Sequence, residues 1–298
     1  MSTALLSIFF VVIGQFLNAS IVLIDKYIVT KTTVSKPAVY AFYVGIISGV
    51  VIVLLPLGII EFPSATVLGL SVLLGLIFIL SIILLFTALK AANATDVVAW
   101  LTAFSTISTF LLSGLLLNES LPGSFPFALV FFIIGAVMVG HFRFNRKSFL
   151  LVIISGILFG LSAVLIKILF QHTTFWNGFF WSRMGNVFGA LILLSFSQIR
   201  LGLVNTSKSV GHKASFLIIL NRVLGGVAFL SILYAIRLGS VSIANALGSL
   251  QFVFVFLMVF LLRHKIPDLF HHEFRPGHIA HKIVSIVFII TGFFVLFL

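Results

Sequence analysis

Apolar segments long enough to cross a membrane recur from one end of this chain to the other. A spanning helix needs about 20 consecutive apolar residues, and segments of this kind fill most of the 298 residues, with short polar breaks between them. Apolar residues make up 61% of the chain and charged residues 8%, which is too little charge to cover a water-soluble globule. The sequence therefore predicts an all-α protein that forms one integral membrane domain.

The hydropathy pattern predicts ten transmembrane helices. Their ranges are 4–25, 38–60, 66–89, 95–117, 124–142, 148–170, 176–198, 214–237, 241–262 and 280–298. The first apolar segment has no basic residue before it and no clear small-residue cleavage pattern after it, so we expect a retained span rather than a signal peptide.

An internal repeat divides the chain into two halves. Residues 88–95 resemble residues 235–242, which follow at an offset of 147 residues, and each segment lies between two hydrophobic helices. Five predicted spans fall in residues 1–142 and five in residues 148–298. Because five is an odd number, the second half would enter the membrane in the opposite direction to the first. The sequence therefore predicts two inverted five-helix repeats, an arrangement that many membrane carriers build around a central site.

Weaker matches extend the repeat. Residues 23–26 near the end of span one resemble residues 164–167 near the end of span six. Glycines recur at matching places of two further spans: Gly45 and Gly49 in span two, Gly185 and Gly189 in span seven. These matches align span one with span six and span two with span seven.

Basic residues collect in the loops after spans one, five, seven and nine. They are Lys26, Lys31, Lys36, Arg143, Arg146, Lys147, Arg200, Lys208, Lys213, Arg263, Lys265 and Arg275. These loops lie on one face of the predicted topology. The positive-inside rule would make this face cytoplasmic and place both termini outside.

The order of these features is similar to that of the drug/metabolite transporter superfamily, in its EamA-like ten-helix branch. The resemblance rests on Ala-Leu-Lys at 88–90, Ala-Ile-Arg at 235–237, the exit of span four at 118–122 and the glycines of span five, and it covers nearly the whole chain. It implies a transporter whose spans three, four, eight and nine border a central cavity. Family members often have both termini in the cytoplasm, which disagrees with the charge count, so the orientation stays open. Residues 264–267, His-Lys-Ile-Pro, depart from the acidic exit of the first half.

Two arginines inside predicted spans are the main candidates for substrate contact. Arg183 lies several residues into span seven, and Arg222 lies inside span eight. A charge at the centre of a span costs about 2.5–3.5 kcal/mol on insertion scales, so such a residue usually faces a cavity or a partner. All six acidic residues fall near span ends or in loops, so neither arginine has an obvious acidic partner. We expect one or both to bind an anionic substrate group; snorkelling toward lipid headgroups is the alternative.

Small polar residues occupy one face of two further spans. Span four carries Thr102, Thr106, Thr109 and Ser113, and span nine carries Ser242, Asn245 and Ser249. Helical spacing places each set on one side of its helix. They could line a substrate path, or they could let helices approach closely and hydrogen-bond to each other. We expect packing for most of them and substrate contact for Thr106 and Asn245.

Four more residues complete the predicted substrate site. Trp100 in span four could stack against a substrate, and Asn186 follows Arg183 by three residues. Asn18 in span one and Tyr234 in span eight are weaker candidates. The resemblance supports such a site, because spans four and eight border the cavity in the family.

Several function classes are disfavoured. Small multidrug exporters of the superfamily use an acidic residue within the first span for proton exchange, but here Asp25 falls close to the predicted helix end. The Lys and Arg residues are scattered over loops and helix ends, where they would meet membrane lipid rather than nucleic acid. No span carries an acidic pair or a histidine box, so we expect no enzyme, cofactor or metal. The five histidines between His264 and His281 match no metal motif and fit a solvated loop.

The sequence thus predicts a multi-pass secondary transporter in a prokaryotic cell (inner) membrane. It would move a small neutral, zwitterionic or anionic metabolite, such as an amino acid, by alternating access between the two halves. A multidrug or organic-cation exporter of the same superfamily is the alternative, and a membrane-embedded enzyme or a channel is less favoured. The oligomeric state does not follow from the sequence.

Overall fold

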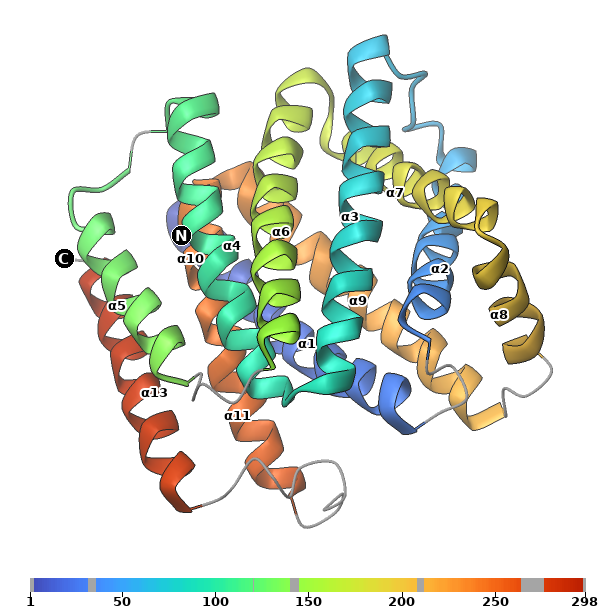
Figure 1. Cartoon of the computed structure of the whole chain (residues 1–298). Helices are drawn as coiled ribbons and strands as arrows, with labels where there is room; N and C mark the ends of the chain where they lie inside the picture. The colour runs from blue at the N-terminus through green and yellow to red at the C-terminus, as the bar shows by residue number, and fades with distance from the viewer. Residues whose placement is uncertain are drawn as a thin grey trace.

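The computed structural model describes residues 3–31, 36–119, 121–139, 145–207, 212–263 and 276–296. Within these ranges the chain forms helices joined by short connections, and none of the described residues lies in a β-strand (Figure 1). The helices are α1 (Thr3–Lys31), α2 (Pro37–Ile47), the 3₁₀ helix η1 (Ser48–Leu57) that continues α2, α3 (Ala65–Ala91), α4 (Ala94–Leu117), α5 (Phe125–Val139), α6 (Arg146–His172), α7 (Phe175–Ile192), η2 (Leu193–Ser195), α8 (Ser197–Ser207), α9 (His212–Leu238), α10 (Val241–Ala246), η3 (Leu247–Ser249), α11 (Leu250–Leu262) and α13 (Pro276–Leu296).

Seven of the described helical segments are long and apolar enough to cross a membrane. They are Leu5–Thr30, Pro37–Leu57, Ala65–Ala91, Ala94–Leu117, Arg146–His172, Ser215–Leu238 and Val241–Leu262. Two shorter apolar helices, Phe125–Gly135 and Ala280–Leu296, lie at the places of the fifth and tenth predicted spans. The protein is therefore an integral multi-pass membrane protein, which confirms the predicted class.

The chain turns sharply inside the seventh predicted span. Helices α7 and η2 end at Ser195, and α8 leaves from Ser197 at an angle of 99°. The guanidinium group of Arg200 donates to the carbonyl oxygens of Leu194 and Ser195, at 2.6 and 3.4 Å, and so satisfies acceptors that the bend frees. If this bent pair is counted as one span, the described residues contain eight.

Polar residues mark the short joints between long helices. The side chains of Ser64, Thr174 and Ser240 each accept a hydrogen bond from the backbone N–H three residues later, at the starts of α3, α7 and α10. This is the usual N-cap arrangement, which satisfies one of the unpaired amides of a first helical turn. At the other end of α4, Asn118 adopts a left-handed conformation with φ 49° and ends the helix.

The helices pack as a bundle in which one close crossing stands out. Helix α1 packs on α9, α3 packs on α6 and α7, α4 packs on α6, and α5 pairs with α13 at the left edge of Figure 1. At the α3–α7 crossing, a Cβ atom at Gly75 would lie 1.9 Å from the carbonyl oxygen of Gly185. A Cβ at Gly185 would lie equally close to the carbonyl oxygen of Ser71. The two backbones touch there only because neither residue has a side chain.

Two lysines cap helix ends in the same way. The ammonium group of Lys26 on α1 donates to the carbonyl oxygens of Leu89 and Ala92 at the end of α3, both at 2.6 Å. The ammonium group of Lys167 on α6 donates to the carbonyl oxygens of Ile236 and Gly239 at the end of α9, at 2.6 and 2.7 Å. A cation is favourable at a helix C-terminus, where carbonyl groups lack helical partners.

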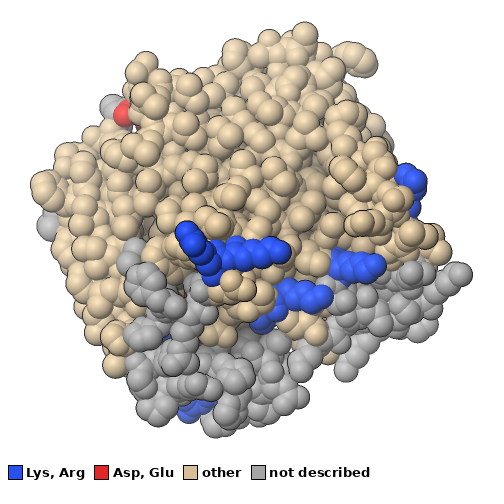
Figure 2. Space-filling view, in the orientation of Figure 1, with Lys and Arg blue, Asp and Glu red and all other residues tan. Residues whose placement is uncertain are grey.

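The surface is mainly apolar, as a lipid-facing surface requires. Large apolar side chains are exposed on most long helices, for example Leu115 on α4 and Leu261 on α11. Figure 2 shows Lys and Arg side chains across the middle and lower part of the visible face and at its right edge, while most of the described surface above them carries no charge. On this face the described charges therefore occupy a limited part of an otherwise apolar surface.

Candidate functional site

A cavity of about 800 Å³ lies inside the helix bundle. Its wall is built from α1, α2, η1, α3, α4, α6, α7, α9, α10, η3 and α11, so residues from both halves of the chain contribute. Most wall residues are aliphatic or aromatic. The ionisable residues among the described wall residues are Asp25, Arg183 and Arg222, which makes these three the first candidates for specific binding.

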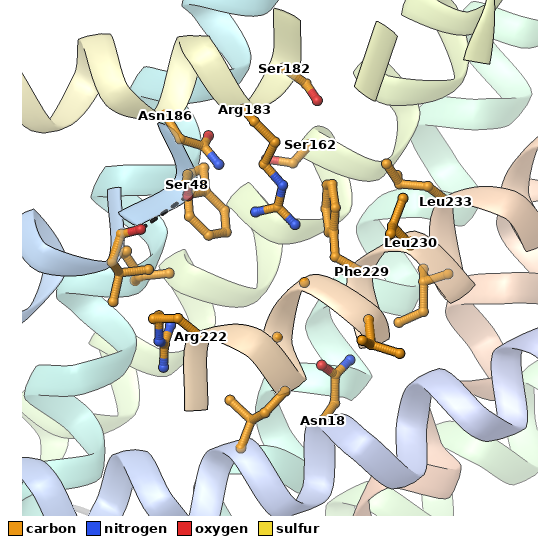
Figure 3. A pocket seen from close by; sticks show the side chains of 18 of the residues that line it. Asn18, Ser48, Ser162, Ser182, Arg183, Asn186, Arg222, Phe229, Leu230 and Leu233 are labelled. Carbon is orange, nitrogen blue, oxygen red and sulfur yellow. Dashed lines mark hydrogen bonds between the residues drawn. The ribbon is translucent and has the colours of Figure 1, made fainter. Parts of the chain in front are cut away.

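Arg183 extends from α7 into the cavity and has no counter-ion among the described residues (Figure 3). The residue is only 9% exposed. Its guanidinium carbon lies 3.6 Å from the ring centroid of Phe229 on α9 and 5.7 Å from that of Phe179 on α7. These cation–π contacts orient the group without neutralising it. A buried arginine without a counter-ion is therefore available to a negatively charged ligand.

Arg222 is placed differently, and the prediction that it lacks an acidic partner is wrong. Its Nη2 atom lies 2.6 Å from Oδ1 of Asp25, in an ion pair, and 3.0 Å from the hydroxyl oxygen of Tyr40. The hydroxyl group of Tyr40 also donates to Asp25 at 2.5 Å, and the amide group of Asn221 donates to Asp25 at 2.6 Å. Asp25 is only 4% exposed, and its carboxylate accepts hydrogen bonds from these three donors. This network joins α1, α2 and α9.

The prediction that Asp25 lies close to a helix end is wrong, because the first helix is longer than predicted. The predicted span ends at residue 25, but α1 continues to Lys31. The charges at 25 and 26 suggest a helix end in the sequence. In the structure both charges are inside the bundle, because Arg222 pairs with Asp25 and the last carbonyl groups of α3 accept from Lys26.

Three buried polar atoms in the wall lack hydrogen-bond partners within the described structure. They are Oε1 of Gln15 on α1, Oγ of Ser162 on α6 and Nε of Arg222 on α9. A buried polar atom usually has a partner, and an unpaired one costs about 1–3 kcal/mol. Together with Arg183, the Ser162 and Gln15 atoms offer a charge, a hydroxyl group and an amide oxygen to a ligand. Asn18 and Asn186 also line the cavity (Figure 3).

Five of the eight predicted substrate residues lie in the cavity wall. They are Asn18, Arg183, Asn186, Arg222 and Asn245. The side-chain amide of Asn245 donates to the hydroxyl groups of Ser105 and Thr109 on α4, so this residue also ties α10 to α4.

The other three predicted residues do not belong to the wall. Trp100 is buried in the hydrophobic core, where it packs on Phe149 with ring centroids 5.0 Å apart. Tyr234 packs edge-on against Phe10, at 5.0 Å between ring centroids. The hydroxyl group of Thr106 donates to the carbonyl oxygen of Asn245, at 3.1 Å.

The hydroxyl face of α4 serves mainly as contact between helices. Ser113 shares a hydrogen bond of 2.6 Å with Ser242 on α10, and Thr109 donates to the carbonyl oxygen of Gly160 on α6. Thr102 lines the cavity, but its hydroxyl group bonds to its own helix. Packing thus accounts for most of this face, as expected.

Sequence reasoning missed several wall residues. Phe179 and Phe229, which hold the Arg183 guanidinium, belong to apolar runs that give no sign of their role. Gln15 and Asp25 could have been found, because each is a polar residue inside or next to an apolar segment. Of the histidine-rich segment, residues 264–275 lie outside the described residues. Among those described, no group of three or more metal-binding side chains occurs.

Comparison with known proteins identifies the fold without identifying the family. No family model and no curated protein matches this chain. Twenty-eight chains of solved structures match it. One of them, described only as the crystal structure of a protein, has a TM-score of 0.66 over 99% of this chain and 96% of its own length, at 17% sequence identity. At that identity the match shows a shared fold over nearly the full length of both chains.

Proposed function

We propose that this protein is a secondary transporter that moves a small, negatively charged metabolite by alternating access. In this proposal it belongs to the EamA-like branch of the drug/metabolite transporter superfamily. Its ten spans would form two inverted five-helix halves in a prokaryotic cell membrane. The observation that carries the proposal is Arg183, a buried cation that faces a central cavity with no counter-ion among the described residues.

The charges of the cavity wall favour an anion. Asp25 and Arg222 neutralise each other through their ion pair, which leaves the charge of Arg183 uncompensated in the described wall. An uncompensated charge in a low-dielectric interior is costly. A carboxylate or phosphate group offsets that cost, and a guanidinium group can bind either with two parallel hydrogen bonds. Among the predicted neutral, zwitterionic and anionic metabolites, anionic ones therefore fit best.

Matching contacts in the two halves support the proposed repeat. Lys26 and Lys167 lie in the aligned segments 23–26 and 164–167, and each caps the aligned helix of its own half. The first turns of α4 and α10 also correspond, because each forms a side-chain hydrogen bond to a residue of the opposite half of the chain. Thr95 accepts from Lys282, and Ser242 donates to Glu119. Such equivalence is expected of carriers built from two related halves.

A binding and transport assay tests the proposal. The purified protein is screened for thermal stabilisation by amino acids, nucleotide sugars, organic anions and cationic drugs, since a ligand that binds the folded state raises its melting temperature. Ligands that bind are then tested for counterflow in proteoliposomes. We expect an anion to bind and to be transported, and Arg183→Gln to weaken its binding by about tenfold to hundredfold.

A matched variant controls for the loss of charge. Arg237 also lies near an aromatic ring, 5.5 Å from the centroid of Phe175, but it is outside the cavity wall. Arg237→Gln should therefore leave binding unchanged. Stabilisation by cationic drugs alone would support the organic-cation exporter instead, and an ohmic current without saturable counterflow would indicate a channel.

A further inference from the structure

The cavity opens sideways, between η1 and α9. Six of its wall residues have exposed side chains: Val50, Val53, Trp176, Ile219, Val223 and Val227. Two lie on η1, three on α9 and one in the first turn of α7. All other described wall residues are buried or partly buried. We refer to the gap bordered by Val50 and Val53 on one side and by Val223 and Val227 on the other as the lateral opening.

The two helices that border the lateral opening meet at one end only. The hydroxyl group of Tyr40 on α2 accepts hydrogen bonds from Arg222 and Asn221 on α9, and these contacts close the gap next to Val223. Beyond it, α9 forms no packed interface with the described residues of α2 or η1. A Cβ atom at Gly226, which lines the cavity here, would meet no other atom within 4 Å. The opening is thus not filled by the chain itself.

The lateral opening lies at the depth of the bilayer interior. Helix α9 has 27 residues, and Val223 and Val227 flank its centre. At 1.5 Å per residue the centre of this helix is about 20 Å from either end, while the hydrocarbon core of a bilayer is about 30 Å thick. The exposed side chains at the opening are all apolar. An opening of this kind meets lipid chains rather than water.

We propose that the cavity binds an amphipathic anion whose charged head group lies at Arg183 and whose apolar tail extends through the lateral opening into the bilayer. This inference rests on the proposed transport function and specifies its substrate class. Charge complementarity fixes the head group, because Arg183 is the uncompensated charge of the described wall. The apolar rim favours an apolar tail, because the side chains that border the lateral opening are exposed valines near the centre of α9 and on η1.

A spin-label experiment tests whether the opening meets lipid. The chain contains no cysteine, so Val223→Cys places a nitroxide at a single site. Leu115→Cys on the lipid-facing side of α4 and Lys90→Cys at the exposed end of α3 serve as the lipid and water references. In liposomes we expect the label at 223 to be relaxed by oxygen as at 115, and hardly by a water-soluble nickel complex. Relaxation by nickel equal to that at 90 would overturn the inference.

A photolabelling experiment tests the ligand itself. The probe is a twelve-carbon carboxylate with a diazirine at the end of its tail, and a twelve-carbon trimethylammonium analogue is the charge control. In liposomes we expect the carboxylate probe to label η1 or α9, and Arg183→Gln to reduce this labelling at least tenfold while Arg237→Gln leaves it unchanged. Gly226→Leu, which fills the opening, should also reduce it. Labelling that is insensitive to Arg183→Gln, or as strong with the cationic analogue, contradicts the inference.

The two proposals can fail separately. If water-soluble anions bind and exchange in an Arg183-dependent way while the tailed probe does not label η1 or α9, the amphipathic substrate is wrong and the transport function stands. If neither the soluble anions nor the tailed carboxylate bind, both proposals are wrong.

Discussion

The α3–α7 crossing and the gap between α2 and α9 occupy corresponding places in the proposed repeat, yet they are packed in opposite ways. At the first, Gly75 and Gly185 let two backbones touch. At the second, Gly226 faces open space, and the hydroxyl group of Tyr40 on α2 accepts hydrogen bonds from Asn221 and Arg222 on α9. Gly75 and Gly185 therefore let α3 and α7 close one side of the cavity, whereas Gly226 leaves space between α9 and its neighbours on the other side. The difference also separates the two arginines, since the one beside the open gap is paired and the one on the closed side is not.

The largest expected effect comes from breaking the buried ion pair that joins α1 to α9, beside the gap between α2 and α9. Asp25→Ala leaves Arg222 buried without its partner, and breaking a buried ion pair in this way costs about 3–5 kcal/mol. Reversible unfolding in mixed detergent micelles measures the change. The double variant Asp25→Leu with Arg222→Leu should recover part of the loss, because it removes both charges. If Asp25→Ala unfolds like the wild type, the network does not stabilise the fold.

The close crossing is the next most sensitive place. Gly75→Ala puts a methyl group where the carbonyl oxygen of Gly185 lies, so the helices must separate. We expect a loss of about 3 kcal/mol, at the upper end of ordinary overpacking effects. The same unfolding assay applies, and a stability equal to that of the wild type would show that α3 and α7 do not touch at these glycines.

The two lysine caps should respond alike. Lys26→Met and Lys167→Met each remove two hydrogen bonds from a charged donor to helix-end carbonyl groups, and such bonds contribute about 1.5–3 kcal/mol. Equal losses of unfolding free energy in the two variants would support the view that the halves are equivalent away from the cavity. A loss in only one variant would contradict that equivalence.

The smallest effect is expected at the lateral opening. Gly226→Ala adds a methyl group where no atom lies within 4 Å, so no clash arises. Because alanine favours a helix over glycine by about 0.5–1 kcal/mol, the variant should be equal to the wild type or slightly more stable. Marked destabilisation would show that α9 packs closely against another segment at this point, contrary to an open gap.

Much of the fold could be predicted from the sequence, because hydropathy is a local property. The long apolar helices lie close to their predicted ranges, and residues such as Ser64 and Ser240 cap them where the sequence breaks. The errors occur where local patterns are overridden. Asp25 looks like a helix end in isolation, but partners on α2 and α9 allow it to lie inside the bundle. The bend between α7 and α8 falls at Ser195–Ser197, next to the end of the seventh predicted span, so the sequence marks an end there but not the direction in which the chain continues.

The candidate site could be predicted only in part, for a related reason. The free-energy cost of placing a charged side chain inside a membrane is enough to identify Arg183 and Arg222 as residues that need a cavity or a partner. Which of them has a partner depends on residues nearly 200 positions away in the chain, so only the structure distinguishes them. Trp100 and Tyr234 have the chemistry of substrate contacts, but they face other aromatic rings.

The sequence by itself determined that this protein is helical, spans the membrane several times and carries buried arginines, since each of these follows from the composition of short segments. The tertiary structure decided which arginine is neutralised, which glycines bring backbones together and where the cavity opens. Those properties depend on the distances between helices, and a one-dimensional pattern of apolar and polar residues does not contain them.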